Sequence, residues 1–451
     1  NGGFNTSLTA FYHGGDLKGL TGTCEPGDDG LARIKSLGFT AVWLTPVVTQ
    51  QEAIGAGSGY HGYWGVDFLN VDPHLGTNAD MLEFSKCAKK LGLKVILDVV
   101  TNHTGDVIKY LGNSPYIPAE SKKLKNPAWL NDLNNYHNVG DVSSCWGNGN
   151  CTKLGDFYGL DDLATEKPVV YKGWADVYGQ WISKYGISGF RVDTARHVDD
   201  KFFKNWSPLI KATATKANIK DFTIFGEVFD YSTFNLMTYV RQNKIETLLD
   251  FPFQAKATEF ASGYSNAPAL SILFEKDDYY TSATSSASNL VTFLGNHDVG
   301  RVGFILGSKR IQPPAQLLPR ANLANALLYF SRGIPVVYYG DEVGMTGTNA
   351  GNDQFARQDM FATQVEIWKN EIRIGGSPIG DGDAFQATNT SPIARYLKQI
   401  SELRRTNPGL ANGVMQIRHS LNSLFVISKK DPLENREYIV AFNNSDSDES
   451  V

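Results

Sequence analysis

Short runs of β-branched and aromatic residues alternate along this chain with helix-length segments. Such alternation is typical of repeated β-α units, in which helices cover a parallel sheet. The strands are expected at Thr40–Leu44, Lys94–Val100, Gly189–Val192, Thr223–Glu227, Thr247–Asp250, Leu290–Leu294 and Pro335–Tyr339. The helices between them are expected to include Gly30–Leu37, Met81–Leu91, Tyr171–Tyr185, Phe202–Ala214 and Leu317–Ser331.

Strands in this number and order predict an α/β fold, the (β/α)8 TIM barrel, with one strand unaccounted for. The sequence before Cys24 contains no convincing β-α unit, and Phe11–Asp16 is typical of a loop. The missing strand is therefore expected to be the first one. We expect the chain to begin inside the loop that follows that strand.

Two stretches interrupt the alternation. Residues 103–168 are rich in Asn, Gly, Pro and Asp and are too long for an ordinary β-α loop, which predicts a small inserted domain after the third strand. After Arg405, antiparallel strands are expected at Gly413–His419, Ser423–Ser428 and Tyr438–Phe442, as the start of a C-terminal β domain. The predicted domains are a barrel of residues 1–102 and 169–405, the insertion 103–168, and the first part of the β domain, 406–451.

Composition and charge narrow the range of partners. The chain has 451 residues, of which 42% are hydrophobic and 20% charged, as in globular proteins large enough for a barrel and smaller units. A net charge of −5 gives no reason to expect binding to nucleic acid or to an anionic membrane surface. No apolar run approaches the roughly 20 residues of a membrane helix. A monomer is expected.

Four cysteines bear on the cellular compartment. Cys145 and Cys151 bracket a small turn-rich loop, and a disulfide between them is expected. Cys24 and Cys87 could form a second bridge, but their spacing does not decide this. The chain starts at Asn1, which fits either a removed signal or a trimmed start. We expect a secreted protein, and the sequence leaves open whether it is extracellular or periplasmic.

Three acidic residues follow three of the predicted strands. They are Asp193, Glu227 and Asp298, each placed after a short apolar run and before polar sequence. Carboxylates at the carboxyl ends of parallel barrel strands can converge on one pocket. A carboxylate pair that flanks a glycosidic bond is the usual equipment for its hydrolysis, so the pattern indicates a carbohydrate-active enzyme.

The segments around these acids resemble the α-amylase family of glycoside hydrolases. Four of them match short family motifs, in the family's order, on the predicted strands three, four, five and seven. Two more segments resemble the family's aromatic loop after strand two and the segment that ends its inserted domain. The matching segments are 98–103 (DVVTNH), 189–197 (GFRVDTARH), 226–229 (GEVF), 293–298 (FLGNHD), 60–64 (YHGYW) and 159–164 (GLDDLA).

The resemblance implies a retaining mechanism. Asp193 is expected to be the nucleophile and Glu227 the general acid and then the general base. Asp298 is expected to hold sugar hydroxyls and to stabilise the oxocarbenium-like transition state. Arg191 points to the same face of its strand as Asp193, and a nearby guanidinium would keep that carboxylate ionised. Val228 and Phe229 could supply the less polar walls that keep Glu227 protonated.

The resemblance also implies substrate contacts. His103 and His297 are expected to contact sugar hydroxyls, and Tyr63 to stack beneath the sugar beside the cleaved bond. His61, Trp64 and Asp67 are candidates for lining the same pocket, and Arg357 and Asp353 for reaching the cleft.

A structural calcium ion, Ca2+, is the metal that the resemblance implies, since calcium prefers six to eight oxygen ligands. Asn102 and Asp162 carry over as side-chain ligands, with the backbone carbonyl of His197 and a further carbonyl near Lys153. The ion would clamp the inserted domain to the barrel. Asp141 and Asp156 are possible further ligands that the sequence does not place. Zinc is not expected, because no His/Cys cluster has suitable spacing.

The preferred function is endo-hydrolysis of α-1,4-glucans such as starch or maltodextrins, with an α-glucan polysaccharide or maltooligosaccharide as partner. One rival is a 4-α-glucanotransferase or a cyclodextrin-forming or cyclodextrin-degrading enzyme with the same site. Phe229 favours this rival, because cyclodextrin-forming transferases carry Phe at the matching position. A second rival is a non-catalytic carbohydrate-binding relative, which is expected to lack one or more of the acids that this chain keeps.

Overall fold

Parallel strands form the centre of the fold and follow one another in space in chain order. The computed structural model describes residues 3–52, 57–143, 151–310, 313–347, 353–376, 378, 384–431, 433 and 435–450. A sheet of five strands, ordered β1-β4-β9-β10-β11, continues through a parallel bridge between Leu249 and Val291 to the parallel pair β12-β13. The strands are β1 (Ala41–Leu44), β4 (Lys94–Val100), β9 (Gly189–Asp193), β10 (Thr223–Gly226), β11 (Thr247–Leu248), β12 (Val291–Phe293) and β13 (Ile334–Val336).

Each of these strands overlaps a predicted run, with differences of a few residues at the ends, and the predicted (β/α)8 class is confirmed. Within the described residues, β1 pairs with β4 alone and β13 with β12 alone. Every residue of β9 is buried, as expected for a parallel strand covered by helices outside and by packed side chains inside. Phe225, Leu249 and Phe293 form part of one buried cluster contributed by successive strands.

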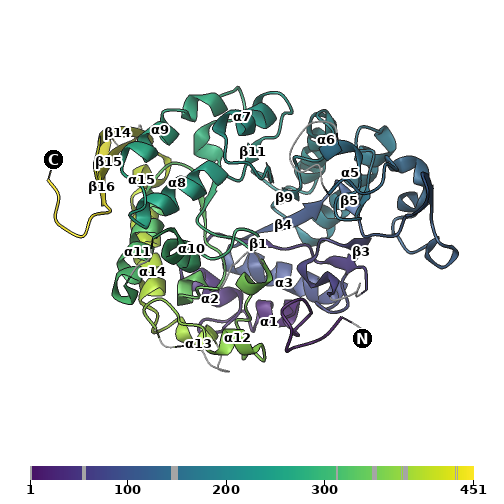
Figure 1. Cartoon of the computed structure of the whole chain (residues 1–451), viewed down its shortest axis with the longest axis horizontal. Coiled ribbons are helices and arrows are strands. Elements are labelled where there is room, and N and C mark those ends of the chain that lie inside the picture. The colour runs from purple at the N-terminus through teal and green to yellow at the C-terminus, as the bar shows by residue number, and fades with distance from the viewer. Residues whose placement is uncertain are drawn as a thin grey trace.

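Helices follow the strands and form the outer layer (Figure 1). The helix Asn78–Leu91 begins at a capping box of Thr77 and Asp80 and ends at left-handed Gly92, so local sequence sets both of its ends. The helices are α1 (Leu17–Thr21), α2 (Leu31–Ser36), α3 (Asn78–Leu91), α5 (Pro168–Tyr185), α6 (Phe202–Lys216), α7 (Thr233–Arg241), α8 (Phe251–Ala261), α9 (Pro268–Phe274), α10 (Val302–Lys309), α11 (Pro314–Phe330), α12 (Glu366–Lys369), α13 (Ala384–Ala387), α14 (Pro392–Thr406) and α15 (Pro408–Asn412).

The long segment between β4 and α5 returns to the barrel close to where it leaves. β5 (His103–Thr104) and β8 (Asp161–Asp162) pair antiparallel directly beyond the carboxyl end of β4. Inside the segment, the buried Lys125 ammonium lies 2.5 Å from the Asp161 carboxylate, which also accepts two backbone hydrogen bonds. The segment also contains β6 (Lys109–Leu111), β7 (Ser114–Tyr116) and α4 (Cys151–Leu154).

The cysteines are placed as follows. Cys24 and Cys87 form a disulfide with 5.7 Å between their Cα atoms, which decides the pairing that their spacing left open. Cys151 is also disulfide-bonded, and its predicted partner Cys145 lies outside the described residues. In the described part of the chain, no helix is both long and apolar enough to cross a bilayer.

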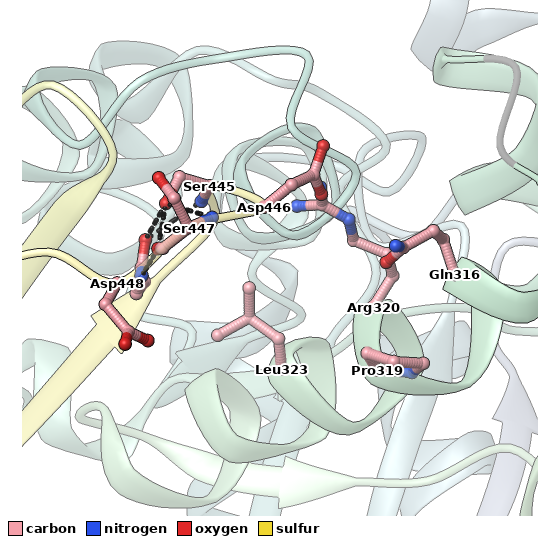
Figure 2. Close-up of a pocket in the computed structure, with 9 residues that line it drawn as sticks. Gln316, Pro319, Arg320, Leu323, Ser445, Asp446, Ser447 and Asp448 are labelled. Carbon is pink, nitrogen blue, oxygen red and sulfur yellow. Dashed lines mark hydrogen bonds and ion pairs between the residues drawn. The ribbon is translucent and has the colours of Figure 1, made fainter.

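Three antiparallel strands close the chain at the end of the molecule opposite the segment that contains β5 (Figure 1). They are β14 (Val414–Leu421), β15 (Leu424–Asp431) and β16 (Arg436–Asn443), and they confirm the predicted antiparallel unit. Phe425 of β15 stacks on Phe274 of α9, with 5.9 Å between ring centroids. Arg320 reaches from α11 to Asp446 at 2.7 Å, beside a polar cavity of about 540 Å³ (Figure 2). None of the three predicted catalytic acids lines this cavity.

Candidate active site

Arg191 is the centre of the candidate site. It lies on β9 two residues before Asp193, so the two side chains share a face of the strand, and the strand register places Asp98 of β4 beside it. Its Nη1 donates to Asp98 at 2.9 and 3.0 Å and to Asp193 at 2.7 Å, while Nη2 lies 2.8 Å from Glu227 Oε1. One fully buried guanidinium thus gathers three carboxylates from three neighbouring strands.

Glu227 directly follows β10 and continues its ladder for one further bond, from the Glu227 amide to the Val192 carbonyl at 2.9 Å. The Glu227 carboxyl accepts a hydrogen bond from the Thr194 amide at 3.3 Å. Thr194 adopts a left-handed backbone with φ of 45°, which is uncommon for a β-branched residue. This turn directs the Thr194 amide toward Glu227 immediately after Asp193.

The shared pocket shifts the two acids in opposite directions. Burial opposes ionisation of Asp193, but Arg191 and His103 outweigh it and hold the pKa of Asp193 below its usual value. Burial, reinforced by the negative charges of Asp193 and Asp298, raises the pKa of Glu227 to about 8 in spite of the nearby Arg191. At neutral pH the site therefore holds an ionised Asp193 beside a protonated Glu227.

Asp298 follows β12 and belongs to a second connected group. Its carboxylate lies 3.1 Å from His297 Nε2 and 3.4 Å from Arg357 Nη2, and burial raises its pKa. Arg357 also donates to the His297 carbonyl at 3.1 Å and pairs with Asp353. Tyr60 accepts from Arg357 Nη1 at 3.3 Å. Arg357 therefore joins the segment after β13 both to the end of β12 and to the loop that contains Tyr60.

The Tyr63 ring lies between the two groups. Its hydroxyl donates to Asp98 at 3.0 Å and lies 2.7 Å from His297 Nε2. Burial and the positive charges of Arg357 and Arg191 hold the pKa of His297 well below its usual range, so this ring is neutral. Because the Tyr63 proton goes to Asp98, Nε2 of His297 is the donor between the two rings.

Local backbone geometry presents Tyr63 to the site. It lies in the loop between β2 (Val48–Gln50) and β3 (Gly65–Val71), after a 3-10 turn that ends at Gly62. Gly62 has φ of 93°, and a Cβ atom there would lie 2.6 Å from the Pro46 carbonyl oxygen. Only glycine suits this position, so the sequence Gly62-Tyr63 fixes where the aromatic ring stands.

The other predicted substrate contacts are distributed around this ring. His103 donates from Nε2 to the Tyr63 carbonyl at 3.3 Å, and His61 stacks on Tyr63 with 5.8 Å between centroids. Trp64 meets the edge of His61 at 4.7 Å. Asp67 makes a different set of hydrogen bonds: its carboxylate accepts from the side chains of Asn70 and Asn126.

Phe229 lies two residues beyond Glu227. Its ring packs on the buried Phe251 with 4.7 Å between centroids, and its carbonyl accepts from Arg196 Nη1 at 2.9 Å. Phe251 in turn contacts Phe293 of β12 at 5.1 Å. Phe229 is therefore the outward continuation of the aromatic cluster at the carboxyl ends of β10 to β12.

Two of the predicted calcium ligands, Asn102 and Asp162, lie where the segment after β4 returns. The β5–β8 pairing sets Asp162 opposite His103, and Asn102 accepts the Leu163 amide at its own carbonyl at 2.9 Å. Within the described residues, Asn102 Oδ1 and Asp162 Oδ1 are buried without a hydrogen-bond partner. His137 Nδ1 orients the other Asp162 oxygen at 2.5 Å.

The side chains of the remaining metal candidates have other contacts, whereas the prediction for His197 and Lys153 concerns their backbone carbonyls. Asp156 accepts the Asp162 amide at 3.0 Å and the Tyr110 hydroxyl at 2.9 Å, so it supports the return strand. The Asp141 carboxylate accepts from Ser143, and the Lys153 side chain pairs with Asp200. The His197 ring lies 5.0 Å from that of Phe157. Among the described residues, no three His, Cys, Asp or Glu side chains are grouped as a metal site.

Asp98 and Trp43 belong to the site and were not among the predicted residues. Asp98 binds Arg191, and Trp43 donates from Nε1 to Asp98 at 3.1 Å. The signal for Asp98 was a charged residue inside the otherwise apolar residues 95–100, where burial demands a partner. Trp43 gave no such signal, because an aromatic residue in a strand is ordinarily core.

Comparison with known proteins places this barrel and its acid cluster among the glycoside hydrolases. The sequence model of the family described as "Alpha amylase, catalytic domain" matches residues 3–373. The chain therefore belongs to the α-amylase family.

Individual relatives agree with this assignment. An α-amylase of Streptomyces lividans is 38% identical over 500 aligned residues, covering 100% of this chain and 53% of the relative. A cyclomaltodextrin glucanotransferase of Klebsiella oxytoca is 26% identical and covers 99% and 68%, respectively. The crystal structure of an α-amylase from Geobacillus thermoleovorans, complexed with acarbose, superposes with a TM-score of 0.74 at 29% identity, covering 98% of this chain and 83% of the other. The chain thus spans about half the length of the Streptomyces relative.

Proposed function

We propose that the protein hydrolyses internal α-1,4-glucosidic bonds of starch and maltodextrins with retention of anomeric configuration. The observation that carries this proposal is that one buried guanidinium, Arg191, lies 2.7 Å from Asp193 and 2.8 Å from Glu227. Around it the pKa values of the two acids are shifted in opposite directions. Two carboxyl groups held in opposite protonation states are what a retaining glycosidase requires. The α-amylase relatives support the choice of α-1,4-glucans as substrate.

In the first step, an Asp193 carboxylate oxygen attacks the anomeric carbon and the bond from that carbon to the leaving oxygen breaks. Glu227 gives its proton to the leaving oxygen, so the shortened chain departs as a neutral alcohol. In the second step, the ionised Glu227 takes a proton from water, whose oxygen attacks the same carbon and releases Asp193. Both residues return to their starting protonation states.

The second group orients the sugar. Asp298 and neutral His297 contact sugar hydroxyls, and the Asp298 charge stabilises the positive charge that develops on the sugar. His61 and His103 would add hydroxyl contacts. Tyr63, stacked on His297 at 5.6 Å, offers its ring to the sugar beside the cleaved bond. Arg357, whose Nη2 lies 3.4 Å from the Asp298 carboxylate, holds that carboxylate in position.

A product time course on maltoheptaose and soluble starch tests this proposal. We expect wild type to produce short maltooligosaccharides with an early loss of starch viscosity, and Glu227→Gln to abolish both. Phe234→Ala, on the exposed face of α7, is a matched control that retains wild-type activity. Full turnover by Glu227→Gln would contradict the assignment, and no turnover by folded wild type would favour the non-catalytic carbohydrate-binding alternative.

A 4-α-glucanotransferase or a cyclodextrin-forming or cyclodextrin-degrading enzyme is the second candidate. This candidate is favoured by Phe229, which lies in the loop that follows Glu227, and by the similarity to a cyclomaltodextrin glucanotransferase. A sugar hydroxyl would then replace water in the second step, helped by stacking on Phe229. Phe229→Leu is expected to lower the ratio of transfer to hydrolysis products. Cyclic products, or products longer than the starting heptaose, would identify the transferase.

We propose further that Asn102 and Asp162 hold a calcium ion with the carbonyls of His197 and Lys153. The two buried, unpaired side-chain oxygens fit the oxygen preference of calcium. A bound ion would supply a structural clamp between the segment after β4 and the barrel. Chelation by EGTA is expected to lower the melting temperature of wild type, and Asn102→Ala to remove calcium binding in titration calorimetry. Unchanged melting with EGTA would contradict the clamp.

The disulfide Cys24–Cys87 supports a location outside the cytoplasm, either extracellular or periplasmic. We propose that the protein acts there as a monomer on α-glucan polysaccharides or maltooligosaccharides. We also propose the domain boundaries 1–102 with 169–405, 103–168 and 406–451. Light scattering on the purified protein tests the monomer directly.

A further inference from the structure

Tyr231 continues the aromatic cluster outward from the acid/base. It lies four residues after Glu227 and two after Phe229, in the loop between β10 and α7. Its ring meets Phe229 edge-on at 5.9 Å and Phe251 edge-on at 5.8 Å. Phe251 is fully buried, whereas Tyr231 is 48% exposed. The cluster therefore runs without a break from the barrel interior to the solvent at the loop that follows Glu227.

The loop that carries Tyr231 is fixed on both sides of it. Before it, Arg196 donates to the Phe229 carbonyl at 2.9 Å. Asp230 accepts from the Ser232 amide at 2.8 Å and from the Asn235 side chain at 2.9 Å, which ties the loop to the first turn of α7. An exposed ring on a backbone held in this way can receive a ligand with little further ordering, which favours binding.

From this arrangement we propose that Tyr231 is a stacking platform for a sugar on the leaving-group side of the cleaved bond, beyond Phe229. The inference rests on the proposed function, since Glu227 must face the leaving oxygen. Side chains that continue from Glu227 along its own loop then border the sugars that depart with that oxygen. A half-exposed tyrosine ring offers a flat apolar face and a polar edge, as a glucose ring requires. Tyr231 would thereby set the preference for longer chains on that side.

The test compares two substrates that differ in what occupies the leaving-group side. Maltoheptaose can place sugars beyond Phe229, whereas α-maltotriosyl fluoride has only fluoride as its leaving group. The readout is the ratio of kcat/KM for maltoheptaose to kcat/KM for the fluoride. Tyr231→Leu, which keeps apolar contact with both phenylalanines, is expected to lower this ratio roughly three- to tenfold. Tyr231→Phe, which keeps the flat ring, is expected to retain it.

Phe234→Ala is the matched control. Phe234 is 63% exposed on the first turn of α7, and none of the ring contacts found in the described residues involves it. For the Phe234→Ala variant, the ratio of kcat/KM for maltoheptaose to kcat/KM for the fluoride is expected to equal that of wild type. A wild-type ratio in Tyr231→Leu, with both substrates turned over, would overturn this inference and leave the proposed function standing. A wild type that hydrolyses neither substrate would overturn both.

Discussion

Arg191 lies opposite Asp98 in the register of β9 and β4, and its Nη1 donates to both Asp98 oxygens at 2.9 and 3.0 Å. Both side chains are fully buried. Asp98 therefore fixes the guanidinium that Asp193 and Glu227 share, although Asp98 lies on a different strand, β4, from either acid. This pairing explains how a cationic side chain can remain inside the barrel while Nη1 also binds Asp193 and Nη2 lies beside Glu227.

Removal of Asp98 should damage both stability and activity. Asp98→Ala leaves Arg191 with less buried negative charge, and breaking a buried pair typically costs about 3–5 kcal/mol. Asp98→Asn keeps an oxygen acceptor and should cost less. Chemical denaturation measures the stability and starch hydrolysis the activity. Wild-type stability in Asp98→Ala would contradict the role given to this pair.

The pH profile should report the two acids. As pH rises through about 8, Glu227 loses the proton that the proposed mechanism requires it to donate, so kcat/KM should fall on the alkaline side. As pH falls, Asp193 gains a proton at a pKa below its usual value, which sets the acid limb. Initial rates on maltoheptaose between about pH 4 and about pH 10, a range that covers perturbed carboxyl pKa values, measure both limbs. An alkaline limb that Asp193→Glu moves but Glu227→Asp does not would contradict the assignment.

Glu227 should also lower stability at alkaline pH. Its folded pKa is raised, so the stability present below the unfolded pKa is lost as pH rises through the folded one. Glu227→Gln removes this ionisation and should melt above wild type at alkaline pH, with the difference shrinking under acidic conditions. Melting curves across pH measure the effect. A difference that is constant with pH would show that ionisation of Glu227 is not its cause.

Gly62→Ala should displace Tyr63. The φ of 93° and a Cβ contact of 2.6 Å with the Pro46 carbonyl make the change strained, at about 1–3 kcal/mol. Because the next residue is Tyr63, kcat/KM on maltoheptaose should fall roughly tenfold or more. Gly112→Ala is the control, since Gly112 has φ of 60° and open space around its Cβ. Equal activity of the two variants would contradict the positioning role of Gly62.

The disulfide Cys24–Cys87 should stabilise the fold without serving the chemistry. It closes a loop with a sequence separation of 63, for which chain entropy gives about 4 kcal/mol. The double variant Cys24→Ala/Cys87→Ala should therefore melt at a lower temperature and keep wild-type kcat at 25 °C. Differential scanning calorimetry and a starch assay measure both. An unchanged melting temperature would contradict this prediction.

The sequence predicted the barrel strands and the convergence of the three acids because each acid ends a short apolar run. It did not single out α8, since Phe251–Ala261 is mostly buried and begins shortly after β11, so no polar face marks it as a helix. α14 was missed although Ser391 caps it and Pro392 occupies its first turn. The partners of Arg191 across strands depend on register, which only the folded sheet defines.

Mapping of a trapped covalent intermediate tests the central claim most directly. Glu227→Gln is treated with a 5-fluoro-α-glycosyl fluoride, which slows release of the glycosyl-enzyme, and the protein is digested and analysed by mass spectrometry. We predict a glycosyl mass increment on the peptide that contains Asp193, and on that carboxylate. Modification of Asp298 instead, or an unlabelled enzyme that releases an inverted product, would contradict the account.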